Sequence, residues 1–355
     1  MISEETIELP PPTAPENIPV SALGFEDTET ATHFSYVLTD VVRAVSRYID
    51  LSRLDGITIA YAYDVALADL DRGYEGIRPL TRTNDDTAVG IAMAPAVLRS
   101  SVVKGHLIFY APAVLPIEHK SHERFNQALY LIAHECAHIE DLKRRDDRFP
   151  GTILQQQIYD YEEVFFASIV AVLWEEYAAC RTSAIFGDGQ GSAYEECLIG
   201  ALSAARDEAY AAIRAYRLHG DIKRVLEEAG RPLCEPLRFA AYLLGHLDGR
   251  QEDWGVVPQA RDRLAECDYA SYVDRLATAL RELWATRDSW ESLDVFTPLK
   301  EIAHEVLAEG GMTITRLPDG QARVGRVRSE AQPAVCCWSP RRIRRITLRS
   351  RSALR

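Results

Sequence analysis

Apolar positions recur at intervals of three and four residues along most of this chain, which is the spacing that predicts amphipathic helices. Between residues 31 and 54, for example, Val37, Val41 and Val45 fall on one face of a helix. The longest apolar run, Val164–Trp174, is too short to span a bilayer and indicates a buried helix. We expect helices over residues 31–54, 123–144, 159–186, 193–218, 222–228, 236–247, 259–287 and 299–308.

A smaller part of the chain has the alternating β-branched and aromatic residues that are typical of strands. We expect strands over residues 57–65 (ITIAYAYDV), 88–93 and 105–110 (GHLIFY). Near the C-terminus, Asp319-Gly320 lies between two short runs of strand-forming residues, which predicts a hairpin. The pattern as a whole predicts an α+β fold that is predominantly helical.

Composition varies along the chain and indicates how it is organised. Residues 1–30 are acidic and rich in proline, so they bury little and we expect a disordered leader. From Arg323 to the end there are ten arginines and one acid, so this end carries +9 and the rest carries −22 of the total −13. After the leader we expect a core domain over residues 31–190, a helical region over 191–310, a hairpin over 311–330 and a poorly ordered basic tail over 331–355.

Charge and cysteine usage exclude some classes of protein. An acidic body is unsuited to non-specific binding of nucleic acid, so only the arginine-rich tail offers a contact for nucleic acid or another acidic partner. The N-terminus lacks the basic start and apolar segment of a signal peptide, and no run is long enough for a membrane span. The seven cysteines are odd in number and have no CxxC spacing, which favours a cytoplasmic protein.

The predicted helix over residues 123–144 contains the motif HExxH, as His134, Glu135 and His138. Two histidines four residues apart project from the same side of a helix, so both imidazoles can bind one metal ion. Apolar residues flank the two histidines, so we expect a buried face on which unpaired polar groups would be costly. Glu135 lies beside the pair, where it can accept a proton from water without binding the ion.

A catalytic zinc ion usually has three protein ligands, so the next long helix has to supply the third. Glu176 falls on the same stripe as the apolar positions Phe165, Ile169 and Val172, where a carboxylate needs a partner. Glu175 falls on a different stripe and is the alternative third ligand. We therefore expect His134, His138 and Glu176 to bind Zn²⁺.

With these residues in place, the sequence resembles the gluzincin class of zinc metallopeptidases. In that class HExxH is followed by a glutamate on a later helix, often in a stretch such as E-[FY]-x-A-D, and here the stretch is Glu176–Cys180 (EYAAC). The resemblance covers about residues 57–186. It implies a zincin-like core with a small sheet packed on the HExxH helix, one zinc ion, and hydrolysis of peptide bonds. The metzincin pattern is not met, because Arg144 stands at the position of its third histidine.

The chain departs from the gluzincin pattern at one position. The class often has an aspartate four residues after the glutamate ligand, where it holds the first histidine, and this chain has Cys180 there. Either another acid holds His134, with Asp141 and Asp160 as candidates, or that histidine is less firmly oriented.

Two further roles follow from the resemblance. The strand GHLIFY precedes the active helix, where such a strand commonly pairs with an extended substrate; the alternative is an ordinary core strand. A group that stabilises the transition state has to lie near the zinc ion. Tyr177, Arg181 and His122 are the candidates, and the sequence does not choose among them.

The sequence therefore predicts a zinc-dependent peptidase in which Glu135 is the general base and the partner is a peptide or protein substrate. The alternative is a non-catalytic zincin-fold protein that binds a partner or acts as a regulator. A third, weaker interpretation is a regulator linked to nucleic acid through its arginine-rich tail. The oligomeric state is left open.

Overall fold

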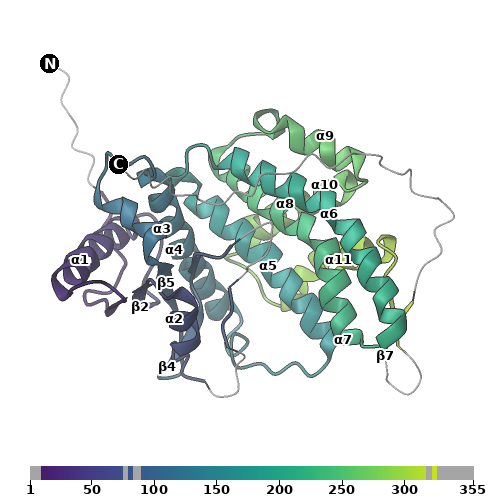
Figure 1. The fold of residues 1–355 in the computed structure, drawn as a ribbon, viewed down its shortest axis with the longest axis horizontal. Coiled ribbons are helices and arrows are strands. Elements are labelled where there is room, and N and C mark those ends of the chain that lie inside the picture. The colour runs from purple at the N-terminus through teal and green to yellow at the C-terminus, as the bar shows by residue number, and fades with distance from the viewer. Residues whose placement is uncertain (1–8, 75–78, 83–88, 317–321, 326–355) are drawn as a thin grey trace, which may run out of the picture.

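The computed structural model describes residues 9–74, 79–82, 89–316 and 322–325. Within these ranges the chain is predominantly helical and has a small mixed sheet, as expected for an α+β fold. The sheet and the helices packed on it lie on one side of the molecule, and the C-terminal helices lie on the other (Figure 1). Helix α5 (Tyr161–Ser183) runs between the two parts.

The main sheet is built on three parallel strands: β1 (Val20–Leu23), β2 (Leu54–Ala60) and β5 (Val102–Tyr110). β2 lies between the other two and pairs Ile57 with Leu107 of β5. On its other side, β5 pairs antiparallel with two short strands, β3 (Ala92–Met93) and β4 (Ala96–Arg99). β5 is therefore an internal strand.

Helices cover both faces of this sheet. Leu107 and Phe109 of β5 point to the face covered by α1 (Thr28–Val45) and α4 (Phe125–Arg148), whereas Ile108 points to α2 (Tyr63–Asp69). α4 comes close to β5 at Gly105, where an added Cβ would lie 2.6 Å from Ile139. The sheet thus fixes the position of α4. Between β5 and α4 the chain forms α3 (Ala111–Val114) and a 3-10 turn (Leu115–Glu118).

The second part of the molecule is a layer of helices with its own apolar core. Its members are α6 (Gln190–His219), α7 (Ile222–Val225), a π-helical turn (Leu226–Gly230), α8 (Arg231–Arg250), α9 (Pro258–Glu266), α10 (Ala270–Thr286) and α11 (Thr297–Glu309), with 3-10 turns at 184–186, 254–256 and 293–296. α8 packs on α5 at Gly245 and Gly249, where an added Cβ would lie 2.3 Å from the carbonyl oxygen of Tyr177 and 2.4 Å from that of Arg181. These two glycines let the backbones of the two helices approach closely.

Several sequence expectations are wrong in detail. The leader is not disordered throughout, because β1 pairs with β2 and Asp27 caps the first turn of α1 by accepting a hydrogen bond from the amide of Thr30. The strand expected over 57–65 ends at Ala60, and its second half starts α2. The helix expected over 259–287 is divided into α9 and α10 at Asp268, which has a φ of 61°.

The expected C-terminal hairpin is present as β6 (Thr313–Arg316) and β7 (Ala322–Gly325), which pair antiparallel. Its turn at Asp319-Gly320 and the basic tail over 331–355 lie outside the described residues, as do residues 1–8 of the leader. Among the described helices, none combines the length and apolar character needed to cross a bilayer.

Candidate metal centre

Helix α4 carries both histidines of the HExxH motif on its buried side. His134 and Glu135 are 8% and 7% exposed, and Ile132, Cys136 and Ile139 around them are fully buried against the sheet. His134 is therefore buried, as the apolar flanks predict, whereas His138 is half-buried, with 18% of its side chain exposed.

Helix α5 supplies the third residue, and a network of polar contacts fixes it against α4. Asp141 of α4 accepts hydrogen bonds from the indole nitrogen of Trp174 at 2.8 Å and from Arg145 at 2.7 Å. Arg145 also forms an ion pair with Glu175 at 2.7 Å. Glu175 therefore lies away from the histidines, and its neighbour Glu176 is directed at them.

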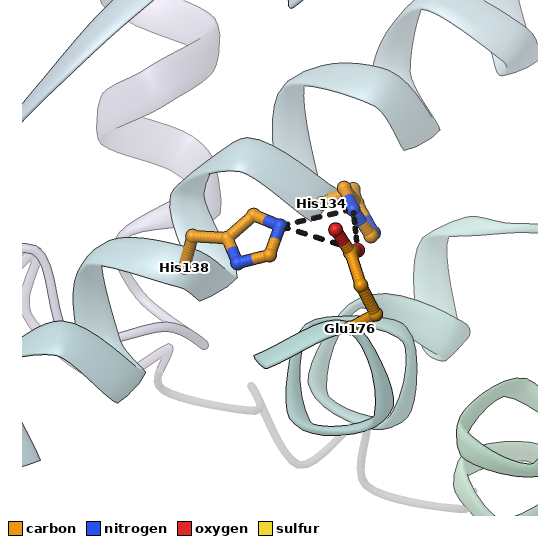
Figure 2. Close-up of side chains that lie close together, drawn as sticks. All are labelled: His134, His138 and Glu176. Atoms are coloured by element: carbon orange, nitrogen blue, oxygen red, sulfur yellow. Dashed lines mark hydrogen bonds and ion pairs between the residues drawn. The ribbon is translucent and has the colours of Figure 1, made fainter. Parts of the chain in front are cut away.

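The three side chains converge on one point (Figure 2). The Nε2 atoms of His134 and His138 lie 3.2 Å apart, and they lie 3.3 and 3.5 Å from Oε2 of Glu176. Ligand atoms at about 2.0–2.1 Å from a tetrahedral zinc ion lie about 3.4 Å from one another. The triangle formed by these three atoms thus has the dimensions of one face of a zinc tetrahedron.

Hydrogen bonding among the protein groups does not account for this arrangement. Oε2 of Glu176 is buried, and no group in the described part of the chain donates a hydrogen bond to it, although both imidazoles lie within 3.5 Å. Two ring nitrogens at 3.2 Å can share one proton at most, and two protons or two lone pairs would repel each other. A cation between the three atoms satisfies all of them at once, so the residues present fit a metal ion.

The electrostatics of the site also favour a positive charge at its centre. Burial opposes ionisation of Glu176, but His138 and His134 outweigh it and hold the pKa of the carboxyl well below its usual value. Burial likewise opposes charging of His138, yet Glu176 raises its pKa above the usual value. The pKa of His134 is raised in the same way, against burial, by Cys180 and Glu176.

Glu135 belongs to the same site without joining the triangle. Burial raises the pKa of its carboxyl, while the charges of His138 and His134 lower it. A carboxylate is a better proton acceptor at pH 7 when its pKa is raised towards that pH. The structure therefore brings together His134, His138 and Glu176, and Glu135 is near enough for their charges to act on its carboxyl.

The position of Cys180 answers the question raised by the missing aspartate. Its Sγ lies 3.8 Å from Nδ1 of His134, on the side of the ring opposite the metal-facing nitrogen. Neither alternative acid serves there. Asp141 is committed to Trp174 and Arg145, and Asp160 caps the N-terminus of α5 by accepting from the amides of residues 162 and 163.

The three candidates for stabilising a transition state form their hydrogen bonds with residues other than His134, His138 and Glu176. The hydroxyl of Tyr177 donates to Asp248 of α8 at 2.7 Å, and Arg181 donates to that same hydroxyl. His122 precedes α4, is exposed, and accepts a hydrogen bond from the amide of Arg124.

Tyr242 of α8 also lies at the site, and no sequence motif predicts it. Its ring stacks on the ring of His134, with a centroid distance of 6.0 Å and an interplanar angle of 11°. Burial and the nearby charge of Glu176 hold the pKa of Tyr242 well above its usual value. No local motif marks this residue, because α8 reaches the site only through its close packing on α5.

Comparison with known proteins gives no match to this chain among protein-family models, curated proteins or solved structures. The arrangement that the chain itself shows is a buried group of two histidines and one glutamate that can hold a metal ion. Beside this group lie the buried carboxylate of Glu135, whose pKa is raised by burial, and the stacked ring of Tyr242.

Proposed function

We propose that this chain is a zinc-dependent hydrolase with a zincin-like core, and that it cleaves peptide bonds. The observation that carries the proposal is the triangle of His134, His138 and Glu176, whose edges of 3.2–3.5 Å fit tetrahedral zinc. Two imidazoles and one carboxylate are a common ligand set of catalytic zinc, which keeps its fourth position for water or substrate.

In this proposal each residue of the site has one role. His134, His138 and Glu176 would hold the ion. When bound, zinc would act as a Lewis acid that brings the pKa of a water molecule near 7. Glu135 would accept a proton from the attacking water molecule and would pass it to the leaving amine. The buried position of Glu135 supports this role, because its pKa is shifted towards the pH at which it works.

The sheet supports a peptide as the substrate. β5 has strands on both sides, so the expectation that GHLIFY pairs with the substrate is wrong. In the described residues β3 has a partner strand on one side only, and it packs near α4. An extended peptide that adds to the open edge of β3 would present its main chain beside the active helix.

The substitution Glu135→Gln tests the proposal. It keeps the shape of the side chain but removes the base, so hydrolysis of a mixed peptide library should fall by about 10²–10⁴-fold while zinc content is unchanged. Glu123→Gln is the matched control, since Glu123 is exposed just before α4. Equal cleavage by both variants would contradict the proposal.

The burial of the site favours a second candidate function. Glu135 is 7% exposed in this conformation, which leaves little surface for a substrate to approach. A non-catalytic zinc module that binds a partner needs no such access. The same Glu135→Gln variant separates the two, because partner binding would survive the change and hydrolysis would not.

A further inference from the structure

A chain of polar contacts leads from the candidate metal centre into the helical part of the molecule. Nδ1 of His134 lies 3.8 Å from Sγ of Cys180, and that thiol donates to the hydroxyl of Tyr194 at 3.4 Å. The hydroxyl of Tyr194 lies 2.8 Å from the hydroxyl of Tyr130. The contacts join helices α4, α5 and α6, and Cys180 is fully buried among them.

The direction of these hydrogen bonds follows from the metal site. If Nε2 of His134 binds a metal ion, its proton has to be on Nδ1, which then donates. The acceptor within reach of Nδ1 is the sulfur of Cys180. The S–H of Cys180 is directed at Tyr194, so the O–H of Tyr194 is free to donate to Tyr130. In this series of three hydrogen bonds, every proton then points away from the metal centre.

We propose that Cys180 is a positioning residue for the metal centre: its thiol accepts the Nδ1–H of His134, and Tyr194 and Tyr130 hold the thiol in place. This inference rests on the proposed function, since it assumes that Nε2 of His134 binds zinc. The thiol stands where the gluzincin pattern has an aspartate, and it replaces a charged acceptor with a neutral one. The two tyrosines supply the orientation that the charge would otherwise provide.

Packing around the chain agrees with a positioning role. Tyr242 stacks on one face of His134, and the ring of Tyr130 lies 6.1 Å from it. Tyr194 in turn packs on Tyr242 at 5.4 Å. The imidazole is thus held by ring contacts as well as by the hydrogen bond at Nδ1, and its Nε2 is aimed at Glu176.

Substitution of Cys180 tests the inference through metal affinity. Contacts behind a metal ligand typically change metal affinity by about 10–100-fold when they are removed. Cys180→Ala should therefore weaken zinc binding about 10–100-fold, measured by competition with a chromophoric chelator. Cys234→Ala is the control, because Cys234 is also a buried cysteine but lies in the core of α8, and its affinity should stay within about twofold of wild type.

Two further measurements distinguish positioning from a general loss of structure. Co²⁺ in place of zinc should show a changed d–d absorption spectrum in Cys180→Ala and an unchanged one in Cys234→Ala. Tyr194→Phe, which removes one hydroxyl and keeps the ring, should weaken zinc binding less than Cys180→Ala does. Zinc affinity and a Co²⁺ spectrum that match wild type in both Cys180→Ala and Tyr194→Phe would overturn the inference.

A chain that binds no zinc even as wild type would contradict the proposed function, and the contact itself is then tested without metal. Cys180→Ala and His134→Ala should lower the thermal midpoint of the metal-free protein by less in combination than the sum of their separate effects. Additive losses would show that Cys180 and His134 do not interact, and would overturn the inference on their own.

Discussion

Asp141 ties the two helices of the metal site together, so its removal should destabilise the protein strongly. The carboxylate is 5% exposed and accepts from Trp174 at 2.8 Å and from Arg145 at 2.7 Å. Each charged hydrogen bond contributes about 1.5–3 kcal/mol. Arg145 keeps Glu175 as a partner, so no buried charge is left alone. We therefore expect Asp141→Ala to lower the free energy of unfolding by about 3–5 kcal/mol.

A matched pair of substitutions makes this prediction specific. Asp141→Asn keeps an oxygen that accepts from Trp174 but replaces the oxygen that accepts from Arg145 with an NH2 group, so it should cost about 1.5–3 kcal/mol. Asp288 forms an ion pair with Arg144, which lies on α4 like Asp141, but the side chain of Asp288 is 69% exposed. Asp288→Ala should therefore cost less than about 1 kcal/mol. Urea denaturation at pH 7 measures all three, provided the slopes agree. An Asp141→Ala cost below about 1 kcal/mol, or equal costs for the alanine and asparagine variants, would refute the reasoning.

Three other predictions concern packing, the choice of ligand and pH. Gly245→Ala should destabilise by about 1–3 kcal/mol in urea denaturation, because its Cβ meets backbone, whereas Gly200→Ala, which meets nothing, should stabilise by up to about 1 kcal/mol; equal effects would contradict the packing. Glu175→Ala should keep its zinc in elemental analysis, and loss would make Glu175 a ligand. Burial lowers the pKa of His246 below 6.5, its value in the unfolded chain, so the neutral imidazole contributes its full stability above pH 6.5 and this contribution falls as the pH drops below 6.5. A His246→Gln variant whose stability has the same slope against pH as wild type would contradict this.

The three residues of the candidate metal centre could be predicted from sequence because their signals are local. His134 and His138 are one helical turn apart, so their common direction follows from helix geometry alone. A carboxylate on an apolar stripe needs a partner, which favours Glu176, and its Oε2 lies 3.3 and 3.5 Å from the Nε2 atoms of the two histidines. Glu175, one residue earlier, lies on a different face and pairs with Arg145.

What surrounds the site could not be predicted, because it is set by contacts distant in sequence. Tyr242 reaches His134 only because Gly245 and Gly249 let α8 approach α5, and no spacing in the sequence shows that approach. The role of Cys180 depends on the hydroxyl of Tyr194 from a third helix. A cysteine in an apolar stretch gives no sign of such a partner.

The pairing of strands in the sheet also could not be predicted from the sequence. GHLIFY is strand-forming, but whether a strand is internal or at an edge depends on which other strands pair with it. The acidic, proline-rich composition of the leader does not reveal β1, because this strand has only four residues, which alternate between half-buried and exposed positions. Its order comes from pairing with β2, about 35 residues later in the chain, rather than from its own composition.

The central claim is that His134, His138 and Glu176 hold one zinc ion, and the metal content of the purified protein tests it most directly. Elemental mass spectrometry would compare wild type, His138→Ala and Glu176→Ala, each purified without added metal. We predict about one zinc per wild-type chain and a clear loss in both variants, because each removes one of three protein ligands. Wild-type protein without zinc even after dialysis against it, or variants that keep a full equivalent, would contradict the account.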